Sequence, residues 1–350
     1  MKRSIQPFAL SLRLLTSCPF SASLVIIALL LVTIPTKGGF KSINDWQNTI
    51  PKAGDLDPTF GSGGKVRTDF FGYFDAAYAV AVQSDGKIIA AGSASDGISY
   101  GFGLVRYNFN GSLDTTFGNG GKVLTHFFGY SGGSQSVAIQ GDGRIVAAGY
   151  TLIENQSYFA LARYNSDGSL DSSFGKNGKV RTNVAGSNAC SVKILTDNRI
   201  LVGGTSYDGV TLARYNRNGT LDPSFGVGGI VVLNFGLGIT SVALQPDGKI
   251  VGAGAINLVN DQSFLVIRLN SDGSLDQEFG ENGKVVTDFY NNVDAALDVK
   301  VQPDGRIVVG GYAYGSPTAF ISFALARYNL DIKCQDIVDT EKCHDIVDAF

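Results

Sequence analysis

Short apolar runs separated by Gly, Asp and Asn turns make up most of the chain after residue 56. Tyr78–Gln83 and Lys87–Ala91 flank a Ser-Asp-Gly turn, which is the pattern of a tight β-hairpin. The runs Phe102–Asn108 and Gly121–Phe127 follow, and an Asn-Gly turn lies between them. These runs carry no apolar period of 3.6 residues, so helices are not expected here. The pattern predicts four short antiparallel strands, which we call A, B, C and D.

This four-strand unit occurs five times. Three phrases mark the copies: Leu-Asp-x-x-Phe-Gly, a strand C that carries an Arg, and an A–B turn that begins with Asp. The first phrase begins at Leu56, Leu113, Leu170, Leu221 and Leu275, with spacings of 57, 57, 51 and 54 residues. The arginines are Arg106, Arg163, Arg214, Arg268 and Arg327. Four strands per repeat of about 50 residues are typical of a β-propeller blade.

The two ends of the repeat region are incomplete in complementary ways. The region begins with a lone strand D at Gly64–Phe70 and ends with strands A, B and C over Leu297–Tyr328. Pairing the lone strand D with this last A-B-C set would complete a fifth blade and remove the free edges of the ring. We therefore predict an all-β, five-bladed propeller with four antiparallel strands per blade, closed by the N-terminal strand.

The repeated phrases LDxxFGxxGKV, VxxQPDGKIVxxG and FALARYNxDGS resemble the delta-60 repeat, a bacterial β-propeller repeat. The resemblance covers roughly residues 56–329. It implies a secreted or cell-surface protein, and it implies no particular reaction.

The remaining segments suggest export. Residues 14–36 carry no charge, and we expect residues 1–40 to be either a cleaved signal peptide or a retained signal-anchor. A linker at 41–55, the propeller at 56–329 and a tail at 330–350 follow. The expected location is extracytoplasmic, secreted or membrane-anchored, with membrane contact only through an uncleaved leader.

The tail contains a nine-residue tandem that places Cys334 and Cys343 in phase. In an exported protein these two cysteines could form a disulfide. A metal site that includes His344 and a tail without fixed structure are the alternatives.

Composition narrows the function classes. A net charge of −3 over 350 residues argues against nucleic-acid binding. The chain has only 2 His and 4 Cys, and His126 is expected on an outer strand, so neither a histidine base nor a metal site is expected. No dinucleotide or phosphate-binding motif stands in a strand–helix context, so no cofactor is expected.

The loops divide into two rims. A–B turns and C–D connections form a repetitive rim, whereas B–C and D–A loops form a variable rim that differs in every blade. Six variable-rim tyrosines are candidates for binding a glycan or a protein, although they could instead cover the blade ends. They are Tyr73, Tyr100, Tyr130, Tyr207, Tyr290 and Tyr314.

Charged residues at repeated positions are expected to be structural. Each strand C arginine can meet the aspartate of the following Leu-Asp phrase in a charge-assisted hydrogen bond. Asp75 and Asp294 are weak catalytic candidates, because they occupy equivalent places in the first and last blades. A glycosidase needs two carboxyl groups about 5 to 9.5 Å apart across the bond. Turn capping is the alternative role for both.

The sequence thus favours an exported, non-catalytic binding or adhesion scaffold that uses the variable rim. The alternatives are a carbohydrate-active hydrolase with funnel carboxylates and a purely structural surface protein.

Overall fold

The computed structural model describes residues 53–127, 131–184, 186–258, 261–289, 292–315 and 320–329. The chain divides into two units, Met1–Asp57 and Pro58–Phe350, and every described strand lies in the second. The expected leader and the cysteines of the tail lie outside the described residues. Within the described part, no helix is long and apolar enough to cross a membrane.

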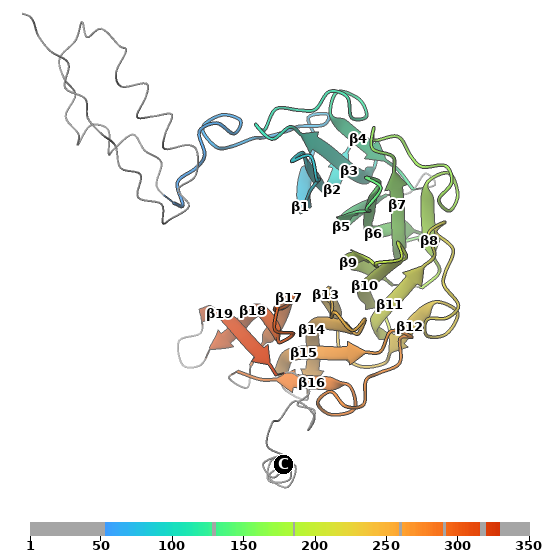
Figure 1. Cartoon of the computed structure of the whole chain (residues 1–350), viewed down its shortest axis with the longest axis vertical. Coiled ribbons are helices and arrows are strands. Elements are labelled where there is room, and N and C mark those ends of the chain that lie inside the picture. Colours follow the sequence, from blue (N-terminus) through green and yellow to red (C-terminus); the bar gives the residue numbers. More distant parts are fainter. Residues whose placement is uncertain are drawn as a thin grey trace, which may run out of the picture. The chain divides into compact units, whose positions relative to one another are not determined.

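The strands of the second unit form five antiparallel sheets, each ordered as in the chain (Figure 1). The strands are β1 (Asp75–Val82), β2 (Ile88–Ser95), β3 (Tyr100–Tyr107), β4 (Lys122–Thr125), β5 (Gly132–Ile139), β6 (Ile145–Ile153), β7 (Gln156–Tyr164), β8 (Lys179–Thr182), β9 (Asn188–Ile194), β10 (Ile200–Ser206), β11 (Gly209–Tyr215), β12 (Ile230–Leu233), β13 (Gly238–Leu244), β14 (Ile250–Leu258), β15 (Asp261–Leu269), β16 (Lys284–Thr287), β17 (Asp294–Val301), β18 (Ile307–Gly315) and β19 (Phe320–Tyr328).

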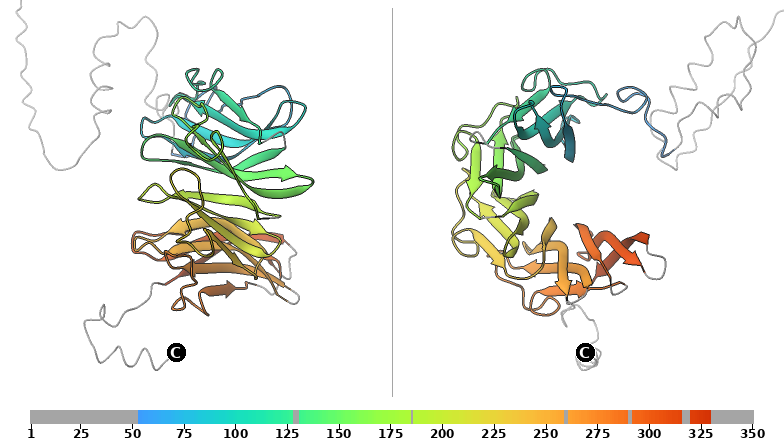
Figure 2. Two further views of the ribbon diagram at one scale, coloured as in Figure 1. Left: turned by 90° about the vertical axis from the view of Figure 1, so that its right-hand side faces the viewer. Right: turned by 180° about the vertical axis from the view of Figure 1, so that it is seen from behind.

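The sheets correspond to the predicted blades. Blades 1 to 4 have four strands each and blade 5 has three, β17 to β19. Neighbouring blades pack face to face in chain order (Figure 2). The structure is therefore all-β, with five sheets that match a five-bladed propeller.

The core lies between successive blades. Because strand side chains alternate between two faces, each blade offers one apolar face to the blade before it and another to the blade after it. Between blades 1 and 2, Phe102 and Leu104 of β3 meet Ile145 of β6 and Tyr164 of β7, and all four are buried. Within a blade, the backbones of the first two strands also approach closely. A Cβ atom at Gly149 of β6 would lie 2.0 Å from the Gly133 oxygen of β5. Glycine is required at that position.

Each complete blade contains a buried ion pair whose arginine, in blades 1 to 3, also binds the following blade, and it confirms the structural role predicted for the repeated charges. In blade 2, Arg163 Nε lies 2.8 Å from Asp171 Oδ2, and its guanidinium stacks on Phe174 with 4.5 Å to the ring centroid. The same arginine donates from Nη1 to the backbone oxygen of Arg217 in the following blade. Equivalent Arg–Asp pairs are Arg106–Asp114, Arg214–Asp222 and Arg268–Asp276.

Replacing Asp171 by Asn should lower the free energy of unfolding by about 3 to 5 kcal/mol, because it leaves the Arg163 guanidinium buried without its counter-charge. The matched control is Asp304→Asn, which removes an exposed pair with Arg306 and should change the free energy of unfolding little. Urea unfolding of both variants measures the difference. Equal losses would contradict the assigned role of the buried pair.

The predicted strand D at Gly64–Phe70 does not join a described sheet. It lies on blade 1 in the way that β4 lies on blade 2. Tyr107 Oη donates to Thr68 Oγ1 at 2.7 Å, as Tyr164 Oη donates to Thr125 Oγ1 at 3.0 Å. The segment thus takes the place that strand D of a preceding blade would take.

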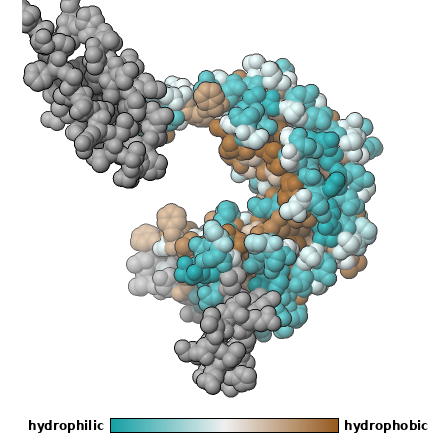
Figure 3. All heavy atoms as spheres, in the orientation of Figure 1, coloured by the Kyte–Doolittle hydropathy of each residue, from teal (hydrophilic) through white to brown (hydrophobic). Residues whose placement is uncertain are grey.

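Two apolar faces at the ends of the blade series remain exposed. Phe323 and Leu325 of β19 are exposed, whereas the equivalent Phe159 and Leu161 of blade 2 are fully buried. Val80 of β1 is exposed as well, and Figure 3 shows apolar residues along the concave side of the unit. No strand of the described chain pairs with the outer edge of β19. The predicted closure of the ring is therefore not confirmed.

Candidate functional site

Aromatic side chains gather on the variable rim of blade 1. Tyr73, in the loop before β1, is 58% exposed, and Tyr100, at the start of β3, is 42% exposed. Phe74 makes an edge-to-face contact with Tyr100, with 6.2 Å between ring centroids. The Tyr73 ring lies against Gly97, where an added Cβ would come within 2.4 Å of Cζ. Gly97 has a φ of 88°, so the absence of a side chain permits both this turn and this contact.

The other four predicted tyrosines do not join this group. Tyr130 and Tyr290 lie outside the described residues. Tyr207 is exposed on blade 3, and its ring packs on Gly186 as the Tyr73 ring packs on Gly97. This packing fits the alternative of covering a blade end. Tyr314 is half-buried on β18.

Beside the aromatic group the fold assembles three polar side chains that sequence reasoning had not connected. Ser99 Oγ lies 3.2 Å from His126 Nδ1, and His126 Nε2 lies 3.1 Å from Asp96 Oδ2. Asp96 and Ser99 belong to the loop between β2 and β3, while His126 follows the last residue of β4. His126 does sit at an outer strand, as expected, but the four-residue loop between β2 and β3 reaches it. No pattern in the sequence signals this contact.

Local backbone groups hold the carboxylate in place. Asp96 Oδ1 accepts hydrogen bonds from the amides of Ile98 and Ser99, both at 2.9 Å. These bonds, more than the neighbouring His126, lower the pKa of Asp96 from its ordinary value. Asp96 is thus a carboxylate at neutral pH, with Oδ2 turned to the imidazole. We call this group of aromatic and polar residues the blade 1 rim site; its members are Tyr73, Phe74, Asp96, Ser99, Tyr100 and His126.

The two weak catalytic candidates, Asp75 and Asp294, each accept a hydrogen bond at the start of a strand A. Asp75 Oδ2 accepts from Phe70 N at 2.8 Å, and Asp294 Oδ2 accepts from Phe289 N at 2.8 Å. Asp294 is fully buried, and this burial raises the pKa of its carboxyl group. These contacts fit turn capping, the alternative role predicted for both residues.

Replacing Asp294 by Asn should change the stability of the protein more favourably at pH 7 than at pH 4, with wild type as the reference at each pH. Because its folded-state pKa is raised, the native carboxyl group contributes stability below its unfolded-state pKa and loses it as the pH rises through the folded-state pKa. The amide removes this loss and keeps an oxygen for Phe289 N. Thermal unfolding of wild type and variant at both pH values measures the effect.

The control for this experiment has the opposite sign. Although burial opposes it, the ammonium of Lys300 and the hydroxyl of Ser241 lower the pKa of Asp298. Asp298→Asn should therefore cost stability at pH 7 and less at pH 4. The same pH trend in both variants would refute the assigned pKa directions.

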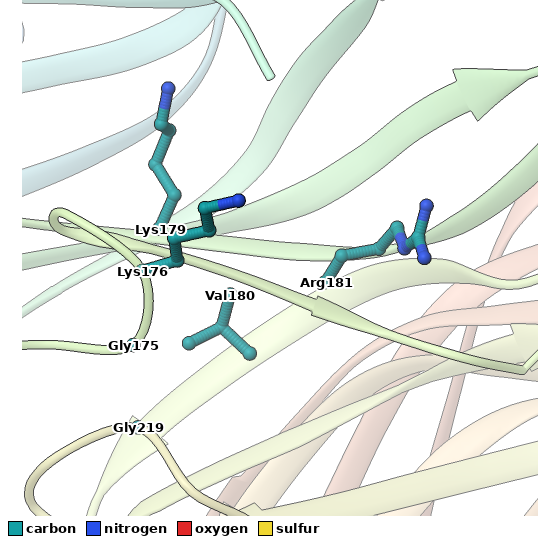
Figure 4. A pocket seen from close by; sticks show the side chains of 6 residues that line it. All are labelled: Gly175, Lys176, Lys179, Val180, Arg181 and Gly219. Carbon is teal, nitrogen blue, oxygen red and sulfur yellow. The ribbon is translucent and has the colours of Figure 1, made fainter. Parts of the chain in front are cut away.

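A cavity of about 470 Å³ on the outer side of blade 2 is flanked by two lysines and an arginine, and in Figure 4 these cationic side chains point in different directions. Its lining residues are Gly175, Lys176, Lys179, Val180, Arg181 and Gly219. Arg181 instead lies over Tyr158, 5.6 Å from the ring centroid. The described residues contain no group of three His, Cys, Asp or Glu that could hold a metal ion.

Comparison with known proteins supports the repeat class. The model of the family described as "Domain of unknown function (DUF5122) beta-propeller" matches five times, at residues 83–117, 140–174, 195–225, 245–279 and 302–331. Each match spans the A–B turn and strand C, and the first four also reach the Leu-Asp phrase. The chain is therefore a β-propeller repeat protein. No curated protein matches it.

Solved structures give distant likenesses of the fold. A hypothetical protein from Leishmania major is 12% identical, with a TM-score of 0.37, covering 71% of this chain and 83% of that one. A polysaccharide lyase described as PL25 ulvan lyase is 10% identical, with a TM-score of 0.40 and coverages of 71% and 68%. A β-fructofuranosidase from Bombyx mori is 16% identical, with a TM-score of 0.36 and coverages of 67% and 55%. At these values the likenesses carry no argument about activity.

Proposed function

We propose that this protein is an exported β-propeller scaffold that binds a glycan or a protein partner through its variable rim. The observation that carries the proposal is the blade 1 rim site. There Tyr73, Phe74 and Tyr100 are exposed together, next to the hydrogen-bonding side chains of Asp96 and His126.

Exposed aromatic rings beside polar groups are suited to recognition. Their faces contact apolar surface, including the C–H faces of sugars, and hydrogen-bonding neighbours then select the partner. On the repetitive rim, which exposes Phe109, many polar groups are instead used locally. Ser169 Oγ, for example, donates to Asp167 Oδ1 at 2.6 Å within one turn. The contrast favours the variable rim as the binding surface.

Three finer statements belong to the same proposal. The repeats are of the delta-60 type, as the repeated phrases suggest. The leader at 1–40 exports the chain, either cleaved or kept as a membrane anchor, and the tail cysteines Cys334 and Cys343 pair after export. The burial of Asp294 supports binding over the hydrolase alternative, because a buried carboxyl group does not meet a polymeric substrate.

Tyr73→Ala and Tyr100→Ala should each weaken ligand binding about 10-fold or more, since truncating a central aromatic contact costs about 1.4 kcal/mol or more. Glycan and protein-ligand arrays identify the ligand, and titration of the variants measures the loss. Tyr207→Ala is the control, because this tyrosine is even more exposed but lies on blade 3. A purely structural role predicts no ligand on either array. Binding that only Tyr207→Ala weakens would place the site elsewhere.

We also propose that the segment at Gly64–Phe70 closes the ring by pairing with β19. It already makes the contacts of a preceding strand D. Gly61 N donates to the Asn110 oxygen at 2.8 Å, as Gly118 N donates to the Asp167 oxygen at 2.7 Å one blade later. Pairing would also cover the exposed apolar residues of β19, whose burial is favourable.

The register of this pairing follows from the complete blades. In blade 1, Phe102 is opposite Thr125 and Leu104 is opposite Val123. In blade 2, Phe159 is opposite Thr182 and Leu161 is opposite Val180. The same register places Phe323 opposite Thr68 and Leu325 opposite Val66.

A cysteine pair tests the register, with the four native cysteines replaced. Val66→Cys with Leu325→Cys should form a disulfide within one chain under mild oxidation, because directly opposed residues of an antiparallel pair have Cα atoms about 4.5 to 5.5 Å apart. The control, Val66→Cys with Ile321→Cys, shifts the pair by four residues and should remain reduced. Disulfide-linked dimers in the first variant would indicate pairing between two copies and would refute closure within one chain.

A further inference from the structure

The polar part of the blade 1 rim site is ordered as a chain of three side chains. Ser99 Oγ is within hydrogen-bond distance of one imidazole nitrogen of His126, and the other nitrogen faces Asp96, at 3.2 and 3.1 Å respectively. A hydroxyl, an imidazole and a carboxylate in this order are the arrangement by which a serine becomes a nucleophile. None of the three is needed to hold the inter-blade core.

The hydrogen-bond partners of His126 define which ring nitrogen carries the proton in a neutral imidazole. Since Asp96 is a carboxylate, it can only accept, so a neutral His126 donates from Nε2. Nδ1 then carries the lone pair, and Ser99 Oγ is its donor. This is the tautomer in which the imidazole can take the serine proton.

A backbone donor lies next to the nucleophile. The amide of Tyr100, the residue after Ser99, lies 3.4 Å from Ser131 Oγ. The amide that follows a nucleophilic serine is a recurrent donor to the oxyanion formed during acyl transfer. The Tyr100 amide is the corresponding backbone donor beside Ser99.

The site is open to solvent and has an apolar side. The side chains of Asp96 and His126 are each 31% exposed, so a small molecule can reach them. Ile98, Tyr100 and Tyr73 are exposed around the same loop. An ester with a small acyl group and an apolar or ring-shaped alcohol would match these surroundings.

We propose that Ser99 and His126 are catalytic residues for the hydrolysis of small carboxylic esters, and that Asp96 is their positioning residue. Ser99 Oγ attacks the ester carbonyl carbon while its proton moves to His126 Nδ1. The ester C–O bond breaks, the alcohol leaves with that proton, and the acyl group remains on Ser99. Water, deprotonated by the same Nδ1, then attacks the acyl carbon and releases the carboxylic acid and free Ser99.

The test uses the full chain and a fluorophosphonate, which bonds to an activated serine with loss of fluoride. Mass spectrometry of the peptides should show labelling of Ser99 at least ten times that of Ser169. Ser169 is the internal control, because it pairs with Asp167 and is not in contact with a histidine in the structure. Initial rates of p-nitrophenyl acetate hydrolysis, with wild type and Ser99→Ala compared, provide the second measurement.

Variants assign the roles. His126→Gln should reduce Ser99 labelling to the level of Ser169 without changing the melting temperature. Asp96→Asn keeps the loop contacts but loses the carboxylate, and should lower the labelling rate about tenfold or more, with partial recovery in Asp96→Glu. Equal labelling of Ser99 and Ser169, or Ser99 labelling unchanged by His126→Gln, overturns the proposal. So does ester hydrolysis by Ser99→Ala at the wild-type rate.

Discussion

The structure depends on the packing of each β-sheet against the next. A four-stranded sheet of this kind has two apolar faces and cannot bury either one by itself. The repeated Arg–Asp pair, stacked on a phenylalanine, forms at the same contact, and its guanidinium also reaches a backbone oxygen of the following blade. Blade spacing is therefore determined by a desolvated charge pair as well as by apolar contact. This explains why the arginine and the aspartate recur together with the Leu-Asp-x-x-Phe-Gly phrase.

The same packing requirement separates the repetitive rim, which holds neighbouring blades together, from the variable rim. On the repetitive rim, turns must present the same carbonyl and carboxylate groups in every blade, so their side chains are committed to contacts inside the repeat. Among the described residues, the variable rim has no counterpart of the repeated Arg–Asp pair, and its loops are free to differ between blades. The loop between β2 and β3 uses this freedom to bring Asp96 and Ser99 to His126 at the end of β4. Binding, and any chemistry at Ser99, is thus placed where it costs the packing of the blades least.

The constraint also explains the exposed ends of the series. Blade 5 has three described strands, and a further segment with the strand D phrase lies at the beginning of the repeat region. The contacts of Thr68 and Gly61 with blade 1 are those of a strand D whose own blade is missing. Ring closure would join the two ends of the repeat region and give Phe323 and Leu325 the cover that their equivalents have in the other blades.

The sequence alone determined the strands, the number of blades and the Arg–Asp pairs, because alternation, turn residues and repeat spacing act within about 60 residues. Asp75 and Asp294 were correctly found to be equivalent, but only the tertiary structure showed Asp294 to be buried and both to accept backbone hydrogen bonds. The meeting of Ser99 with His126, 27 positions apart, was likewise decided by tertiary structure. Such contacts depend on the path of an irregular loop and on strand register, and neither leaves a periodic signal in the sequence.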